Sequence, residues 1–272
     1  MKKISLQDEH FRHEPIGYSC RFHSGKKIQW CRKFPYTSPI TVFTGGSLQC
    51  VVNHWNTTNI AWLIEPYEIA PYTYSLAINN HKFFDLILTH DQNLLSIVPN
   101  SVFMPYGDCW IKEEDWKIYD KTKTCSIFCS DKKLTQQHVL RHNCLEVDGI
   151  DQFGFMRKLE YKLDGLKDYK FSIVVENSTR DDWFTEKLLD CFATGTIPIY
   201  SGTKNIRKYF CEDGMITFSS VAELENIISK IKNREIVYET FLPAIQSNFS
   251  AFRQYVRKDD LVLEILEEKG LI

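Results

Sequence analysis

The sequence predicts an α/β fold made of two small domains with mostly parallel sheets. Short apolar, β-branched segments alternate with amphipathic segments, as strands alternate with crossover helices. The chain has 272 residues, enough for one large domain or two modest ones. A polar stretch dense in Lys, Glu and Asp, residues 112–123, interrupts the alternation. We therefore expect one domain at 1–115 and a second at 116–272.

Strands are predicted by short runs of apolar and β-branched residues bounded by turn residues. Residues 1–36 are rich in His, Lys, Arg and aromatic side chains and permit one strand, around Lys3–Leu6. From Ile40 onward the pattern is clear. We expect strands at 40–43, 59–64, 85–89, 101–104, 124–129, 171–175, 197–200 and 215–218.

Helices are predicted between these strands by apolar residues at helical spacing. Thr135 and either Ser219 or Ser220 are candidate N-caps, and Gly195 is a candidate C-cap. The tail is expected to form two helices, of which the last, 259–269, is amphipathic and packs back on the protein. The other helices are expected at 74–84, 91–97, 135–147, 155–166, 183–194, 206–210 and 221–232, with 48–52 compatible with a helix or a strand.

The segment Phe171–Gly202 organises the second domain. It reads strand, helix, strand, the pattern of a right-handed parallel crossover. In such a unit, ligands bind beyond the carboxyl end of the first strand, beside the helix N-terminus. Polar side chains are concentrated there. A lysine suits a diphosphate, and a carboxylate suits the hydroxyl groups of a ribose. The alternative interpretation is that Glu186 and Lys187 are only an exposed pair of charged residues on the helix. The polar residues there are Glu176, Asn177, Ser178, Thr185, Glu186 and Lys187.

The same segment resembles the donor-binding motif of the family 10 fucosyltransferases. The likeness includes the spacing between Glu176-Asn177-Ser178, Asp182, Thr185-Glu186-Lys187 and the run Ile197–Gly202. It implies the GT-B architecture, in which two Rossmann-like domains are joined by a linker and a C-terminal helix crosses back. The sequence departs from the family at Ser201-Gly202, where Trp-Gly or Leu-Gly is more usual.

The resemblance also implies roles for single residues. Lys187 takes the diphosphate, and Glu186 holds the ribose hydroxyls. Asn177 and Trp183 match positions that frame the nucleotide. Arg141 matches an arginine that reaches the phosphates in relatives of this fold, a task suited to the fixed fork of donors on guanidinium.

The general base is expected from the first domain. Glu65 follows the strand at 59–64, where a carboxylate next to apolar residues suits proton abstraction. A helix-capping or salt-bridged glutamate is the competing interpretation. Glu68 is the nearest alternative base, and His90 and Asp91 could also line the site.

Metal ligands are not expected. Asp181 and Asp182 precede a predicted helix, where carboxylates more often act as caps or as partners of the helix dipole. His138 and His142 are four residues apart, but no third ligand is in view, so a core or solvated pair is the better interpretation. We expect neither a metal nor another cofactor.

These features predict an inverting glycosyltransferase that moves a sugar from a nucleotide-diphosphate sugar to a hydroxyl of a glycan acceptor. The resemblance suggests GDP-fucose; UDP-xylose or another UDP-sugar is the alternative donor. A non-catalytic glycan- or nucleotide-binding protein is the competing function. A phosphoryl-transfer enzyme ranks last, because the sequence has no GxxxxGK[ST] loop.

Charge, cysteine content and hydropathy limit the kinds of protein this chain can be. The net charge of -2 argues against a general nucleic-acid binder. Nine cysteines without a CxxC pair read as reduced core residues. The first residues lack the apolar core of a secretion signal, and no apolar run approaches the ~20 residues that span a bilayer. We therefore expect a soluble cytoplasmic protein without stable membrane insertion.

Overall fold

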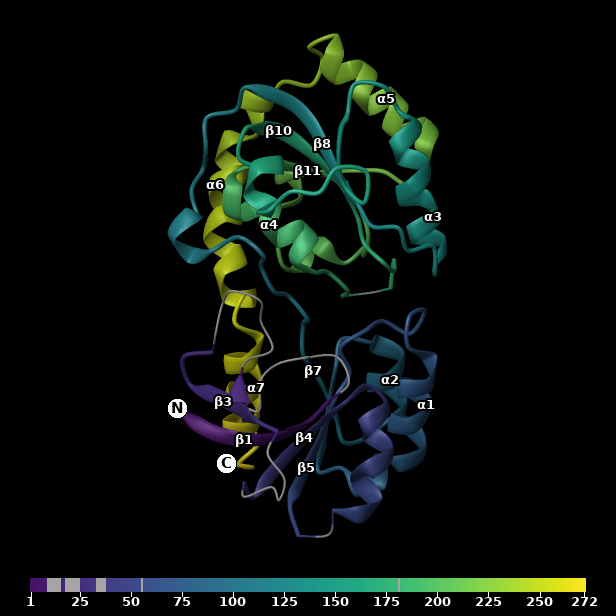
Figure 1. Cartoon of the computed structure of the whole chain (residues 1–272), viewed down its shortest axis with the longest axis vertical. Helices are drawn as coiled ribbons and strands as arrows, with labels where there is room; N and C mark the ends of the chain where they lie inside the picture. The colour runs from purple at the N-terminus through teal and green to yellow at the C-terminus, as the bar shows by residue number, and fades with distance from the viewer. Residues whose placement is uncertain (9–15, 18–24, 33–37, 55, 181) are drawn as a thin grey trace. The chain divides into compact units, whose positions relative to one another are not determined.

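The structure is a computed structural model that describes residues 1–8, 16–17, 25–32, 38–54, 56–180 and 182–272. The chain forms two compact units, each built around one sheet (Figure 1). Unit 1 contains Met1–Asp108, Asp181–Trp183 and Arg257–Ile272, and unit 2 contains Cys109–Arg180 and Phe184–Val256. This division differs from the expected 1–115 and 116–272. The first change of unit comes before the polar stretch, and the last helix belongs with the N-terminal part.

The sheet of unit 1 has the strand order β2-β3-β1-β4-β5-β6-β7. All neighbouring strands are parallel except β2 and β3, which are antiparallel. The predicted strands of this half are confirmed, and the strands at the N-terminal edge add to them. The strands are β1 (Lys2–Gln7), β2 (Ile16–Gly17), β3 (Ile28–Cys31), β4 (Ile40–Thr44), β5 (Thr58–Trp62), β6 (Leu86–Thr89) and β7 (Ser101–Phe103).

Helices cover both faces of this sheet because alternate strand residues point to opposite sides. Ile60 and Trp62 pack in one core with α7 (Lys258–Glu268), while Ala61 packs in another. The second core lies under α1 (Pro71–Asn80), α2 (Gln92–Ile97) and the 3-10 helix η1 (Gly45–Asn53). The helical alternative for 48–52 is thus confirmed. A short 3-10 helix, η2 (His81–Phe83), follows α1.

The sheet of unit 2 is parallel throughout, with the order β12-β11-β10-β8-β9. The predicted strands are again confirmed. The strands are β8 (Lys123–Cys129), β9 (Asp151–Gly154), β10 (Tyr169–Val175), β11 (Ile197–Ser201) and β12 (Ile216–Thr217).

The predicted helix at 155–166 is wrong. The edge strand β9 ends at Gly154, and the chain then continues irregularly to the 3-10 helix η5 (Lys162–Gly165). Gly154 has φ +101, and a Cβ there would lie 2.0 Å from the carbonyl oxygen of Cys129. The turn after β9 therefore requires glycine. After it, the backbone N–H of Phe155 donates to the carbonyl oxygen of Cys129 on β8, and the carbonyl oxygen of Arg157 accepts from the backbone N–H of Gly154.

Most predicted helices of unit 2 are present, with N-caps at Thr135 and Ser220. One start is wrong. Trp183 and Phe184 precede the central helix, which begins at Glu186 after its N-cap Thr185. The helices are η3 (Glu113–Asp115), α3 (Gln136–Asn143), η4 (Cys144–Glu146), α4 (Glu186–Thr194), η6 (Ile206–Lys208), η7 (Glu212–Gly214), α5 (Val221–Lys232), η8 (Tyr238–Phe241), α6 (Leu242–Ala251) and η9 (Phe252–Tyr255).

Candidate functional site

The site in unit 2 is built on the first turn of α4, next to the carboxyl end of β10. The side chain of Thr185 caps the helix by accepting a hydrogen bond from the backbone N–H of Lys187 at 3.3 Å. Gly195 ends the helix in the left-handed conformation, as expected. The helix dipole makes such a helix start favourable for an anion.

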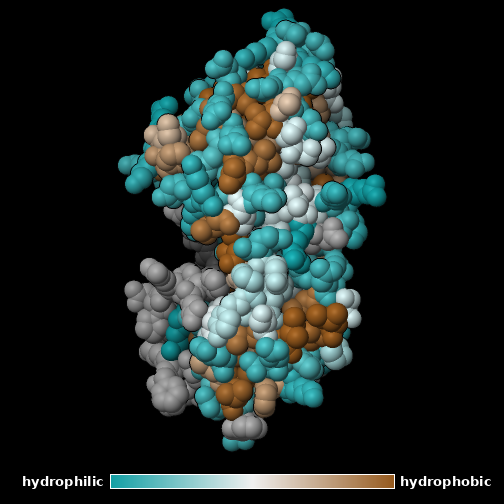
Figure 2. Space-filling model, turned by 90° about the vertical axis from the view of Figure 1, so that its right-hand side faces the viewer, coloured by the Kyte–Doolittle hydropathy of each residue, from teal (hydrophilic) through white to brown (hydrophobic). Residues whose placement is uncertain are grey.

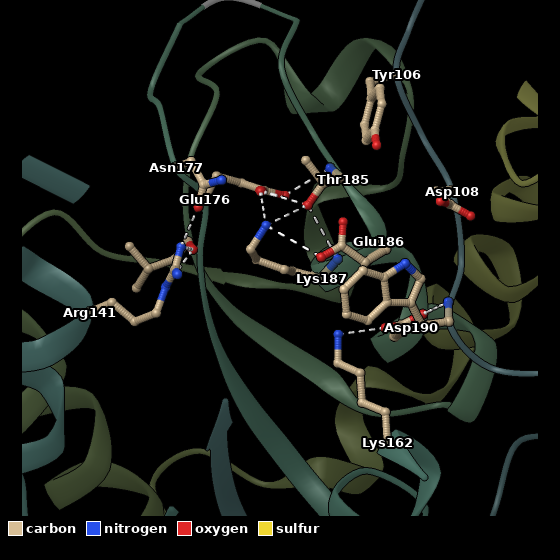
Figure 3. Close-up of polar contacts among 12 residues, drawn as sticks. Tyr106, Asp108, Arg141, Lys162, Glu176, Asn177, Thr185, Glu186, Lys187 and Asp190 are labelled. Atoms are coloured by element: carbon tan, nitrogen blue, oxygen red, sulfur yellow. Dashed lines mark hydrogen bonds and ion pairs between the residues drawn. The ribbon is translucent and has the colours of Figure 1, made fainter. Parts of the chain in front are cut away.

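Glu176 organises the polar residues at this helix start (Figure 3). Its side chain is fully buried, and it accepts hydrogen bonds from the backbone N–H and the hydroxyl of Thr185, both at 2.8 Å. The ammonium of Lys187 lies 3.3 Å from Glu176 Oε2 and 2.9 Å from Thr185 Oγ1. Glu176 therefore supports the cap and the lysine from behind.

Lys187 and Glu186 are the charged groups at the open side of this cluster. The side chain of Lys187 is 21% exposed and that of Glu186 is 12% exposed. Their charged atoms lie 3.5 Å apart. The structure thus brings together, on one helical turn, a cation suited to phosphate and a carboxylate suited to hydroxyl groups.

Arg141 lies on α3 and is buried against the end of β10. Its guanidinium donates to the carbonyl oxygen of Val175 and, at 2.9 Å, to Asn177 Oδ1. Burial lowers the pKa of Arg141, and the charge of Glu176 opposes this effect. The arginine therefore brings positive charge to the site while it holds the turn that carries Asn177.

Asn177 and Ser178 form the turn after β10. The carbonyl oxygen of Asn177 accepts a hydrogen bond from the hydroxyl of Thr135 at 3.0 Å. Ser178 is buried, and its hydroxyl accepts from the backbone N–H of Arg180 at 3.0 Å. Both residues belong to the unit 2 cluster, and these two hydrogen bonds hold the backbone of the turn after β10.

Trp183 is not part of that cluster, because it belongs to unit 1. It is 1% exposed, and its ring stacks on Tyr106 with centroids 5.2 Å apart and lies 4.4 Å from the ring of His90. Among the described residues, nothing accepts a hydrogen bond from its indole Nε1. The neighbouring Asp182 has φ +64 and accepts a hydrogen bond from Gln92 at 2.7 Å. The interpretation of Asp182 as a cap is therefore wrong, since Thr185 caps the helix.

Glu65, the predicted base, lies just after β5 in unit 1 and is half-buried. Its carbonyl oxygen accepts a hydrogen bond from Tyr74 at 3.2 Å, and the hydroxyl of Tyr74 also lies 3.3 Å from His90 Nε2. The backbone at Glu65 is thus fixed from α1.

Sequence reasoning missed a buried ion pair behind the first turn of α4. Asp190 is fully buried and lies 2.6 Å from the ammonium of Lys162. It also accepts a hydrogen bond from the backbone N–H of Trp110 at 2.6 Å. The available signal was a carboxylate set between apolar residues on a buried helix, four positions after Glu186.

The histidine pair on α3 has a structural explanation. His138 Nδ1 lies 3.0 Å from Thr135 Oγ1, and burial, with smaller effects from Arg141 and Lys187, lowers the pKa of His138 to about 4. His142 packs against Phe155. Within the described ranges, no group of three or more His, Cys, Asp or Glu is arranged to hold a metal ion.

Comparison with known proteins identifies the family. Residues 118–256, just over half of the chain, match the model of glycosyltransferase family 10 (fucosyltransferase), C-terminal part. The chain belongs to glycosyltransferase family 10. The matched range contains the whole segment 171–202, so the resemblance drawn from that motif is confirmed.

Curated family 10 relatives match over shorter segments. An alpha-(1,4)-fucosyltransferase of Arabidopsis thaliana is 28% identical over 76 residues, which cover 27% of this chain and 19% of the relative. The alpha-(1,3)-fucosyltransferase FucT of Helicobacter pylori is 28% identical over 87 residues, 32% of this chain and 18% of the relative. The chain thus spans less than a fifth of the length of these relatives.

Solved structures share the fold of this family 10 chain. A crystal structure of an alpha1,3-fucosyltransferase has a TM-score of 0.55 at 15% identity and covers 87% of this chain and 81% of its own. Alr3699/HepE of Anabaena, in complex with UDP and glucose, has a TM-score of 0.57 at 10% identity and covers 85% and 78%. The predicted GT-B fold is confirmed. None of the helices described here is both long and apolar enough to cross a membrane.

Proposed function

We propose that this family 10 chain is an inverting, metal-independent glycosyltransferase that acts on a nucleotide-diphosphate sugar. The observation that carries the proposal is the ammonium of Lys187 on the first turn of α4, supported by the buried Glu176 and by Thr185. A leaving diphosphate needs positive charge that is in place before the bond breaks. Lys187, the helix N-terminus and Arg141 supply that charge.

The other donor contacts belong to the same proposal. Glu186 accepts hydrogen bonds from the ribose hydroxyls, and Asn177 and Ser178 shape the turn beside the nucleotide. The indole N–H of Trp183, buried and without an acceptor among the described residues, is a further donor for the nucleotide sugar.

The reaction is a single displacement. An acceptor hydroxyl oxygen attacks the anomeric carbon, its proton passes to Glu65, and the bond from the anomeric carbon to the diphosphate oxygen breaks. The diphosphate leaves with the electron pair, so the anomeric configuration inverts. Glu65→Gln should lower kcat by about 10²–10⁴-fold with unchanged nucleotide affinity, as expected for loss of a general base. Glu68→Gln is the matched control, and equal loss in both variants would remove Glu65 from this role.

Two observations bear on the donor. Curated relatives are named fucosyltransferases, and one solved neighbour, at TM-score 0.53, contains GDP-fucose. Another neighbour of the same fold contains UDP and glucose. We propose GDP-fucose, with a UDP-sugar as the alternative. A thermal-shift series with GDP and UDP decides between them, because a ligand at about 100 times its Kd stabilises by about 2.7 kcal/mol. Stabilisation by UDP and not by GDP removes the fucose assignment.

A chelator tests the proposed independence from metal. Transfer in the presence of EDTA should equal transfer without it, because side chains supply the positive charge. Loss of transfer with EDTA, and its recovery with added divalent cation, would contradict the proposal.

A non-catalytic binding protein is the second candidate. The observation that favours it is the position of Arg141, whose guanidinium is bonded to Val175 and Asn177. Release of nucleotide diphosphate from the donor separates the two functions. Equal background release by the wild type and by Lys187→Ala would support the binding protein.

A further inference from the structure

Two neighbouring loops of unit 2 share an unusual combination of exposed side chains. Residues 130–134 follow β8, and residues 155–158 follow β9. The strands are parallel partners, with Cys129 opposite Gly154, so both loops leave the same edge of the sheet. The backbone N–H of Phe155 donates to the carbonyl oxygen of Cys129 at 3.0 Å. The two loops, called here the loop pair, therefore lie side by side.

His142 on α3 links the two loops. Its Nε2 lies 3.2 Å from the carbonyl oxygen of Lys132, and its ring is 5.4 Å from the ring of Phe155. Contacts with His142 therefore hold the two loops together as one surface.

Large apolar side chains stand at the tips of the loop pair. Leu134 is 67% exposed, Met156 59% and Phe155 42%, and Val139 on the first turn of α3 is 46% exposed. Apolar side chains lie among hydrophilic ones on the face that carries α3 (Figure 2). Single exposed apolar residues are common, but a group on adjacent loops marks an interaction surface.

Cations flank these apolar tips. Lys132 and Lys133 precede Leu134, and Arg157 and Lys158 follow Met156, all four exposed. Within the described part of the chain, none of the four forms an ion pair. Asp131 and Glu160 are the nearby acids in sequence, which leaves the loops positive on a chain of net charge -2.

We propose that the loop pair docks unit 2 on the surface of an anionic lipid bilayer. Apolar tips enter the boundary between headgroups and acyl chains, and cations beside them contact lipid phosphates. Charge complementarity favours this partner over a neutral apolar one, because four cations that form no ion pair with any described residue flank a small apolar tip. The proposal needs no membrane-spanning helix.

Vesicle flotation tests the proposal with the full chain. Vesicles of phosphatidylcholine with roughly one third phosphatidylglycerol should bind the protein, and pure phosphatidylcholine should bind at least about fivefold less. Binding to the anionic vesicles should fall as NaCl rises, since salt screens the cations. In Phe155→Ser/Met156→Ser the bound fraction should fall about tenfold, because the apolar side chains that enter the bilayer are removed. In Lys132→Gln/Lys133→Gln/Arg157→Gln/Lys158→Gln it should fall by about the same factor, because the cations that contact lipid phosphates are removed.

Matched controls lie elsewhere on unit 2. Leu242→Ser removes an apolar side chain that is 45% exposed, and Lys230→Gln/Arg234→Gln removes two exposed cations near the end of α5. Both controls should float as the wild type does, and all variants should keep the wild-type circular dichroism and Tm. No binding by the wild type, equal binding to neutral vesicles, or wild-type binding by both loop variants would overturn the proposal. Salt-sensitive self-association without flotation would assign the loop pair to a protein partner instead.

Discussion

The ammonium of Lys162 lies 2.6 Å from the carboxylate of Asp190, whose side chain is completely buried. Asp190 is one helical turn from Glu186 and Lys187, so this pair lies directly behind the proposed donor site. Burial acts to lower the pKa of Lys162, but the charges of Asp190 and Glu186 outweigh it and leave the pKa raised. Lys162 therefore neutralises a carboxylate that would otherwise repel both Glu186 and a diphosphate.

Removal of Lys162 should lower both stability and nucleotide affinity, and removal of Asp190 in the same variant should restore most of both. Lys162→Met leaves a buried carboxylate without its cation, which costs about 3–5 kcal/mol of stability. Nucleotide affinity should fall about tenfold, since the uncompensated carboxylate repels the diphosphate. Lys162→Met/Asp190→Asn should recover most of both losses. Urea unfolding and nucleotide titration measure them, and Lys167→Met, which breaks an exposed pair, is the control. A double variant no better than the single would refute this electrostatic role.

Lys187 should contribute to diphosphate binding more than to nucleoside binding. Lys187→Ala removes a charged hydrogen-bond donor, so affinity for the nucleoside diphosphate should fall by about 1.5–3 kcal/mol, roughly 10–100-fold. Affinity for the nucleoside itself should stay near that of the wild type. Lys187→Arg should retain part of the binding, and Lys230→Ala should retain all of it. Isothermal titration compares the ligands, and an equal loss for nucleoside and diphosphate would place the lysine away from the phosphates.

Lys121 should stabilise unit 2 by joining three segments of its backbone. Its ammonium donates to the carbonyl oxygens of Thr194, Lys167 and Leu166 at 2.8, 3.0 and 3.3 Å and to the hydroxyl of Thr196 at 3.0 Å. Lys121→Met removes these four hydrogen bonds from the ammonium and should cost about 2–4 kcal/mol. The urea midpoint measures this cost. Lys117→Met, at an exposed position, should change it little; similar midpoints for the two variants would contradict the prediction.

His138 should make stability depend on pH in the acid range. The unfolded chain takes up a proton near pH 6.5, whereas burial holds the pKa of the folded histidine at about 4. The neutral imidazole therefore stabilises the fold fully above pH 6.5, and this contribution is lost as pH falls from 6.5 toward 4. In His138→Gln the urea midpoint should fall less steeply over that range. His142→Gln is the control and should keep the wild-type slope; equal slopes in wild type and His138→Gln would exclude His138 as the source.

Local patterns predicted most of the fold. Short β-branched runs predicted the parallel strands, and hydroxyl N-caps predicted the starts of α3 and α5, because both signals act within a few residues. The helix expected at 155–166 is absent, and its first residue, Phe155, is instead bonded to Cys129 on β8, a contact that local spacing does not reveal. The expected bounds put the last helix in the second domain, because amphipathic spacing shows that a helix has a buried face and not which sheet it covers. The resemblance implied a C-terminal helix that crosses back, in agreement with the place of α7 in unit 1.

The candidate site was predicted to a similar degree. The motif placed Glu176, Thr185, Glu186 and Lys187 on one strand end and one helix turn, where the structure has them together. The position of Trp183 in unit 1 could not be predicted, because it depends on stacking with Tyr106, which is remote in sequence. The partner of Asp190 could not be predicted either, since Lys162 lies on the 3-10 helix η5, 28 positions earlier in the sequence.

The place of α7 has a consequence for chain synthesis. Val262, Leu263 and Leu266 complete the same core as Ile4 and Trp30, so segments that precede and follow unit 2 in the sequence share one interior. A ribosome releases the segments of unit 2 before it releases α7. One apolar face of the unit 1 sheet therefore stays uncovered until α7 has been synthesised.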